Sequence, residues 1–234
     1  MKILYIYPHP DDESFGPASV MHMQQSQGHE VYLLTLTEGG ATRQRHKYNL
    51  SIEAMGKVRV AEMQDVEKVL RLTGMTILDL PDSGLKEMDP ADIEAVIEEH
   101  ILKIQPDVLV TYPVHGISGF HDHLITHAAV KSVFCRMRSK GTGARRLAFI
   151  ALNEAQAALG KHFRLNCSTP DEIDCVVTVG EEDHQALHKA LDCYKTFTET
   201  INASGVREIL TREMSFEFFQ ENYNPPVQDL FAGL

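Results

Sequence analysis

Cysteine is scarce in this chain, and no two cysteines form a Cys-x-x-Cys pair. Small secreted domains that depend on disulfide bonds are far richer in cysteine. The 234 residues contain only Cys135, Cys167, Cys175 and Cys193. We therefore expect four reduced thiols in a cytoplasmic protein.

Long apolar runs and clusters of basic residues are also missing. The first apolar run, 3–7, is too short for a signal peptide or a membrane segment and meets Pro8 at once. The formal net charge is −11 at pH 7, and no run of Lys and Arg interrupts this acidic surplus. The field at such a surface disfavours nucleic acid and anionic membranes. We expect no nucleic-acid partner and no stable membrane insertion.

Two sequence signatures of common enzyme classes are absent as well. No Gly-x-Gly-x-x-Gly follows a predicted strand, which argues against a dinucleotide-dependent oxidoreductase. No serine stands in the nucleophile-elbow pattern of the α/β-hydrolases. The sequence therefore indicates neither of these two enzyme classes.

Short apolar runs alternate with segments whose apolar residues recur at helical spacing. The predicted strands are 3–7, 31–36, 77–80, 108–112, 147–152 and 173–179. The predicted helices lie between 17 and 28 and at about 52–72, 89–104, 121–138 and 181–200, and the tail from residue 212 is expected to be irregular. This alternation predicts an α/β fold, a mostly parallel sheet with helices on both faces, in a single domain spanning 1–234.

Polar residues crowd the point where the first predicted strand ends. His9-Pro10-Asp11-Asp12-Glu13 places one imidazole and three carboxylates within five residues. In open parallel sheets the ligand crevice lies beyond the carboxyl ends of the strands. A polar turn with Asp12 as helix cap is the competing interpretation. Against it stands the cost of crowding like charges, which a bound cation would relieve.

A second cluster follows the predicted strand at 108–112. It consists of His115, His121, Asp122, His123 and His127, and the last two histidines share a helix face because they are four residues apart. Histidine is a preferred zinc ligand, and a catalytic zinc typically has three protein ligands and one open position. Single members of this cluster are also compatible with helix caps or surface residues.

Together these segments resemble the LmbE-like, or PIG-L, family of zinc deacetylases. Those proteins have a Rossmann-like fold and hydrolyse N-acetylglucosaminyl conjugates. The specific match is the segment 9–13, and the supporting matches are Thr35–Gly39, the Arg-x-x-Glu of Arg59 to Glu62, the turn 80–85, Asp122-His123 and the late-helix segment 189–191. The resemblance spans most of the chain.

The resemblance implies a role for each matching residue. His9, Asp12 and His123 would bind Zn²⁺, although similar ligands also suit Fe²⁺. Asp11 would act as the general base that takes a proton from the metal-bound water. Arg59 and Asp82 would bind a small-molecule amino-sugar conjugate. Asp122 would orient a ligand histidine, and Glu13 would support the site or start the helix without binding the metal.

Two positions depart from the family pattern. Phe120 stands where the family has a histidine that helps to stabilise the oxyanion, and Tyr194 stands near a late histidine. We expect His121 to supply the missing donor, and His115 is the second candidate. The alternatives to an N-deacetylase are a metal-dependent hydrolase of another amide or an ester, and a non-catalytic metal- or sugar-binding member of the family. The sequence is compatible with several kinds of aglycone and with a homo-oligomer.

Overall fold

The computed structural model describes residues 1–234, with seven strands in one sheet in the order β3-β2-β1-β4-β5-β7-β6. Strands β1 to β5 are parallel, and β7 is antiparallel to both β5 and β6. The predicted α/β fold with a mostly parallel sheet is confirmed. The strands are β1 (Lys2–Tyr7), β2 (Glu30–Thr37), β3 (Gly74–Leu80), β4 (Val108–Thr111), β5 (Arg146–Ala151), β6 (Cys175–Thr178) and β7 (Glu213–Phe218).

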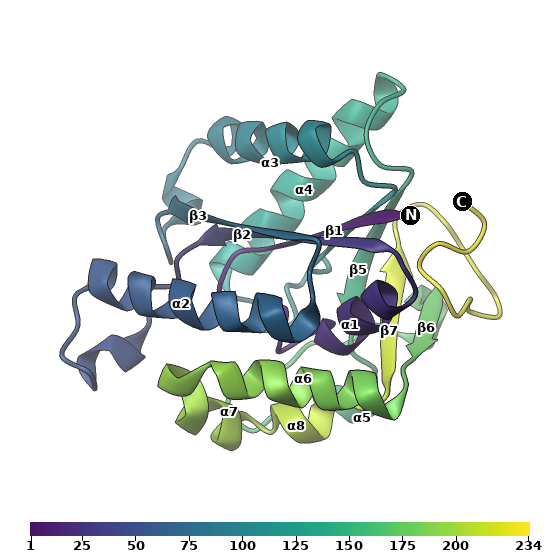
Figure 1. Cartoon of the computed structure of the whole chain (residues 1–234). Helices are drawn as coiled ribbons and strands as arrows, with labels where there is room; N and C mark the ends of the chain where they lie inside the picture. Colours follow the sequence, from purple (N-terminus) through teal and green to yellow (C-terminus); the bar gives the residue numbers. More distant parts are fainter.

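Helices cover both faces of this sheet (Figure 1). α3 and α4 lie on one face, α1, α2 and α6 lie on the other, and α7 and α8 lie below α6 in this view (Figure 1). None of the helices is both long enough and apolar enough to cross a membrane. The helices are α1 (Ala18–Ser26), α2 (Ile52–Leu70), α3 (Pro90–Ile104), α4 (His121–Ser139), α5 (Glu154–Ala157), α6 (Glu181–Cys193), α7 (Thr198–Ser204) and α8 (Val206–Ile209), with 3₁₀ turns η1 (Arg43–His46), η2 (Leu85–Glu87), η3 (Pro170–Glu172) and η4 (Lys195–Phe197).

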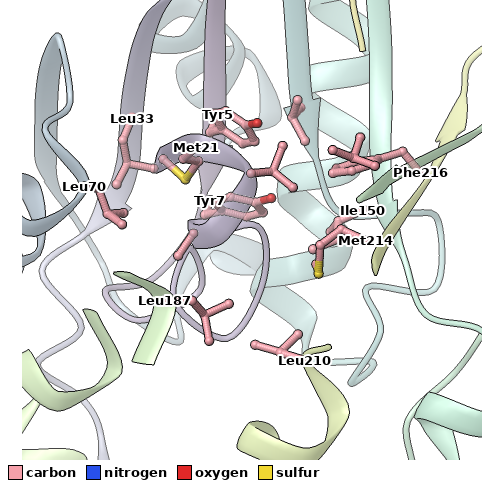
Figure 2. Close-up of a cluster of buried hydrophobic side chains, with 14 of the residues drawn as sticks. Tyr5, Tyr7, Met21, Leu33, Leu70, Ile150, Leu187, Leu210, Met214 and Phe216 are labelled. Atoms are coloured by element: carbon pink, nitrogen blue, oxygen red, sulfur yellow. The ribbon is translucent and has the colours of Figure 1, made fainter. Parts of the chain in front are cut away.

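Strand β1 is apolar from Ile3 to Tyr7 because both of its faces are buried there. Tyr5 and Tyr7 belong to the core under α1 and α6, where Figure 2 shows them near Met21. Leu4 and Ile6 point to the opposite core under α3 and α4. Two apolar layers therefore hold β1 firmly, and the turn that follows it starts from a fixed position.

The strand order creates a crevice at the end of β1. The chain passes from β1 to β2 and β3 on one side, and returns to place β4 on the other side of β1. Ligand sites of open α/β sheets lie at such a switch point, beyond the carboxyl ends of the strands. The turn after β1 and the loop before α4 meet there.

The C-terminal third differs from its prediction in two ways. The expectation of an irregular tail from residue 212 is wrong, because β7 lies between β5 and β6. Met214, Phe216 and Phe218 alternate along β7 and are buried, which is the period of a strand. The helix predicted to reach about residue 200 ends at Cys193, and a 3₁₀ turn then leads into the separate helix α7.

Candidate metal centre and active site

The turn after β1 folds back on itself. The backbone N–H of His9 donates to Asp12 Oδ2 at 2.8 Å, and Asp11 has a φ of 89°, in the left-handed region that non-glycine residues seldom adopt. The N–H of Asp11 is held at 2.8 Å by the hydroxyl of Tyr194, which donates in turn to Glu13 at 2.7 Å. This turn therefore presents the side chains of His9, Asp11 and Asp12 together at the end of β1.

His123 reaches the same place from the first turn of α4. Its Nδ1 lies 2.9 Å from the carbonyl oxygen of Gly116, and its ring stacks on Tyr112 at a centroid distance of 4.0 Å. Gly116 has a φ of 62°, and a Cβ there would lie 2.8 Å from the His123 Cβ, so glycine is required for this approach. Donation from Nδ1 to a carbonyl leaves Nε2 free as a ligand.

Three of these side chains have the geometry of a metal-binding set. Ligand atoms of His9, Asp12 and His123 all lie within 4.8 Å of one another. Nδ1 of His9 is 3.5 Å from Asp12 Oδ2, and Nε2 of His123 is 3.4 Å from Asp12 Oδ1. Two imidazoles and one carboxylate match the ligands that a catalytic Zn²⁺ prefers. The residues present therefore fit a divalent cation.

The charge around His9 also favours a cation. Its Nε2 lies 3.1 Å from Asp122 and 3.4 Å from Asp82, while Asp12 faces the other ring nitrogen. Burial alone would lower the pKa of His9, but hydrogen bonds with Asp12 and Asp122 and the charge of Asp82 outweigh burial and raise the pKa to about 10. Three carboxylates thus surround one imidazole, and Asp122 Oδ1 is buried without a partner. A divalent ion would offset this excess negative charge.

Asp11 and Arg59 form a buried ion pair beside the metal-binding set. Nη2 of Arg59 donates to Asp11 Oδ2 at 2.8 Å and also to the carbonyl oxygen of Pro10. Burial raises the pKa of Asp11 to about 6, although the Arg59 charge opposes the shift. The guanidinium lies 3.7 Å from the centroid of the Phe197 ring, and its Nε and Nη1 are buried without partners. Arg59 therefore fixes the carboxylate and keeps further donors free.

Asp82 lies on the side of the site where β3 ends. Its Oδ2 accepts a hydrogen bond from the N–H of Ala41 at 2.6 Å, which anchors the loop after β2. The sequence assigned Asp82 and Arg59 to the substrate, and both line the cavity that also contains Asp11 and the metal-binding set. This cavity has a volume of about 450 Å³, which is within the range of small-molecule sites.

The other histidines of the second cluster do not reach this cavity. His121 is exposed at the start of α4, and neither it nor His115 lines the cavity. His127 is buried, with Nδ1 2.9 Å from the carbonyl oxygen of Tyr112. Phe120 does line the cavity. The assignment of His121 as the donor stays a prediction, and the structure places it away from the position where a donor would act.

Two tyrosines support the site in ways that motif spacing did not indicate. Tyr112 donates to Asp12 Oδ1 at 2.7 Å, and Tyr194 links the backbone of Asp11 to Glu13. Tyr112 is the last residue of a predicted strand and precedes the second cluster, and this position was the only feature of the sequence that could indicate a role in the site. Tyr194 was noted as a departure from the family pattern, but its contact with residues more than 180 positions away follows only from the fold.

The curated relatives of this chain include deacetylases and an amidase. The chain is 28% identical over 171 residues to a 1D-myo-inositol 2-acetamido-2-deoxy-α-D-glucopyranoside deacetylase of Kineococcus radiotolerans, with 62% of this chain and 47% of that protein covered. It is 29% identical over 152 residues to a mycothiol S-conjugate amidase of Streptomyces coelicolor, with 57% and 52% covered. The chain thus spans about half the length of the curated relatives it matches.

Fold comparison and a family model extend this result. The zinc-inhibited form of teicoplanin deacetylase Orf2 superposes with a TM-score of 0.73 over 93% of this chain and 97% of that chain, at 15% identity, which is a likeness of fold alone. The family model described as GlcNAc-PI de-N-acetylase matches residues 4–134, more than half of the chain and the part that contains all three metal-binding candidates. The chain belongs to the PIG-L, or LmbE-like, family.

Proposed function

We propose that this protein is a zinc-dependent amide hydrolase that removes the N-acetyl group from an N-acetylglucosamine-type conjugate. The observation that carries the proposal is the set of His9, Asp12 and His123 beside the Arg59-bound carboxylate of Asp11. A site that only binds a metal needs no such base. Membership of the family and relatives named as deacetylases and amidases support the proposed bond type and sugar.

The chain's own residues supply the proton transfers. A divalent ion held by His9, Asp12 and His123 would polarise the amide carbonyl and make water more acidic. Asp11 takes a proton from the attacking water and passes it to the departing amine. Arg59 holds this carboxylate in one orientation, because its Nη2 bridges Asp11 and the carbonyl oxygen of Pro10.

Arg59 and Asp82 are proposed to recognise the amino sugar. The unpartnered Nε and Nη1 of Arg59 are buried at the cavity wall and can donate to sugar hydroxyls. Asp82 can accept from a hydroxyl on the same side. Conservative changes of Asp82 should raise KM more than they lower kcat, because this contact is equal in the ground state and the transition state.

The test is release of acetate from N-acetylglucosamine conjugates by the metal-loaded protein. Asp11→Asn should retain the metal and lose about 10²-fold or more in kcat, since Asn keeps the size of the side chain and removes the base. His9→Ala combined with Asp12→Ala should abolish metal binding, measured by elemental analysis. Asp107→Asn, which lies at the opposite end of β4 and pairs with Arg145, is the control for a generic change of charge.

Four results would contradict the proposal. Full metal occupancy in the double variant would remove the metal assignment, and an Asp11→Asn enzyme as fast as the parent would place the base elsewhere. Acetate released from N-acetyl amino acids or esters, but from no sugar conjugate, would identify a hydrolase of another substrate class. Metal binding without turnover of any of these compounds would identify a binding protein instead.

A further inference from the structure

The cavity has two unlike sides, divided by the metal-binding set. On the side of β2 and β3 its wall includes the polar residues Thr42, Gln44, Arg59 and Asp82, together with Phe197, whose ring packs on Arg59. On the side of β5 its wall is an apolar recess, defined by Phe15, Ile150, Leu152, Leu165, Val206 and Ile209. Because β1 and β4 lie between β2 and β5 in the sheet, the metal-binding residues separate the two walls.

The floor of the apolar recess is part of the protein core. Ile150 and Leu152 stand at the end of β5, and both are at most 4% exposed although they line the cavity. Figure 2 shows Ile150 within the main apolar cluster. The Ile150 side chain lies close under the turn after Asp12, since a Cβ on Gly16 would be 3.0 Å from its Cδ1. The recess therefore begins directly beside the metal-binding set.

The roof of the recess is tied down by hydrogen bonds. Gln156, just after β5, donates to the carbonyl oxygen of Ile209 in α8 at 3.2 Å. The segment 158–166 is held at both ends, by Lys161 N–H to Ser204 at 3.2 Å and by Asn166 N–H to Ile117 at 2.8 Å. Lys161, which also lines the cavity, is exposed and paired with Glu208. The six residues that define the recess are thus apolar, and the cavity also contains the polar residues Lys161, His162, Thr200 and Ser204.

The two sides can be assigned to the two halves of an N-acyl amino sugar. The scissile amide joins the sugar through its nitrogen and the acyl chain through its carbonyl carbon. With the sugar at Arg59 and Asp82 and the carbonyl at the metal-binding set, the acyl chain points toward β5. An acetyl methyl group would leave most of the apolar recess unfilled.

We infer that the enzyme hydrolyses amino sugars whose N-acyl group is longer than acetyl, with a linear alkyl chain in the apolar recess. This inference rests on the proposed function and extends it to a class of substrate. Hydrolysis breaks the bond between the amide nitrogen and the carbonyl carbon and joins that carbon to the oxygen of one water. One proton of the water goes to the amine nitrogen as the bond breaks, and the new carboxylic acid gives up the other to the free amine, so the products are the ammonium form of the amino sugar and an alkyl carboxylate.

Chain length is the first test. Glucosamine conjugates with acetyl, butanoyl and hexanoyl groups are compared by release of the free amine, a readout common to all three. Each methylene that becomes fully buried should raise kcat/KM by about four-fold, from the transfer free energy of a CH₂ group. A fall in kcat/KM from acetyl to butanoyl and hexanoyl, with acetyl still hydrolysed, would overturn the inference and leave the proposed function intact. Failure on all three would defeat the proposed function itself.

Variants of the apolar recess are the second test. Val206→Phe narrows the interior, and Leu165→Asp places a charge on the half-buried part of the wall. Both should lower kcat/KM for the hexanoyl substrate at least ten-fold more than for the acetyl substrate. Leu102→Phe, an enlargement at an exposed position of α3, should leave this ratio unchanged. Leu165→Asp keeps the test valid if Val206→Phe does not fold.

The competing occupant of the recess is an apolar aglycone. A series with a fixed acetyl group and aglycones of increasing alkyl length separates the two. If Val206→Phe changes the dependence of kcat/KM on aglycone length, and leaves its dependence on acyl length unchanged, the inference is overturned. If kcat/KM depends on acyl length alone, and the recess variants remove this dependence, the inference is supported.

Discussion

Removing the charge of Arg59 should destabilise the protein strongly, because the guanidinium and the Asp11 carboxylate are buried together. The Arg59 side chain is 2% exposed and that of Asp11 is 15% exposed, with 2.8 Å between Nη2 and Oδ2. Arg59→Met keeps the length of the side chain and its contact with Phe197 but removes both hydrogen bonds. Loss of one partner of a buried pair typically costs about 3–5 kcal/mol.

The lower end of that range is expected for Arg59→Met. The pKa of Asp11 is already about 6, mainly because of burial, so the carboxyl group left behind takes up a proton instead of staying charged and unpaired. Asp11→Asn leaves the opposite charge, which cannot be neutralised in this way, although the carbonyl oxygen of Pro10 and the face of Phe197 still contact it. The double variant lacks both charges and should cost less than the two single changes together, by about 2–3 kcal/mol.

Urea unfolding of the parent, both single variants and the double variant measures this coupling, with all four proteins stripped of metal. Arg136→Met is the matched control, since this half-exposed arginine pairs with Glu94 and Glu98 on the surface between α3 and α4. Its loss should cost at most about 1 kcal/mol. Additive effects of Arg59→Met and Asp11→Asn, within about 0.5 kcal/mol, would refute the view that the two groups stabilise each other.

Three further predictions concern the histidines and their neighbours. Asp122→Asn should weaken metal binding about 10–100-fold in competition with a chelator, because Asp122 orients the His9 ring at 3.1 Å. Burial lowers the pKa of His127, so its contribution to stability is complete above about pH 6.5 and is lost as the pH falls. His127→Asn should therefore flatten the fall in unfolding free energy between pH 7 and 5 by up to about 1.4 kcal/mol per pH unit, and an unchanged slope would contradict this. Phe120→His should raise kcat about 10²-fold by restoring an oxyanion donor to the cavity wall, and a large loss of kcat in His121→Ala would show that the donor is already His121.

The parts of the fold that sequence predicts best are those with one dominant physical cause. Strand β1 is apolar from Ile3 to Tyr7 because this part is buried on both faces, and no helix of five such residues would be stable. α3 begins where Asp89 caps the N–H of Ala91 with Pro90 in the first turn. β7 was missed because its alternating apolar residues lie between polar ones in a segment rich in aromatic residues and without a clear turn signal.

The closeness of His9, Asp12 and His123 could be predicted because each follows a strand that the sequence already marks. His121 shows the limit of that reasoning. It opens α4 as expected, but each residue of a helix turns by about 100°, so when Asp122 and His123 face the crevice their predecessor points to solvent. Spacing gives neighbours along a helix, whereas the direction of the first residue depends on how the helix docks.

The two sides of the cavity differ in how well the sequence predicts them. The proposed metal ligands and the proposed base lie within 4–134. A motif marks each of these positions, because few other residue types could perform the same role there. The apolar recess is made by β5, α8 and the segment 158–166, whose apolar residues have no motif because any residue of suitable size can fill such a wall. Only tertiary packing brings Val206 and Ile209 over the end of β5. The residues proposed to break the bond can therefore be found from motifs in the sequence, whereas the residues proposed to contact the acyl group can be found only from the folded chain.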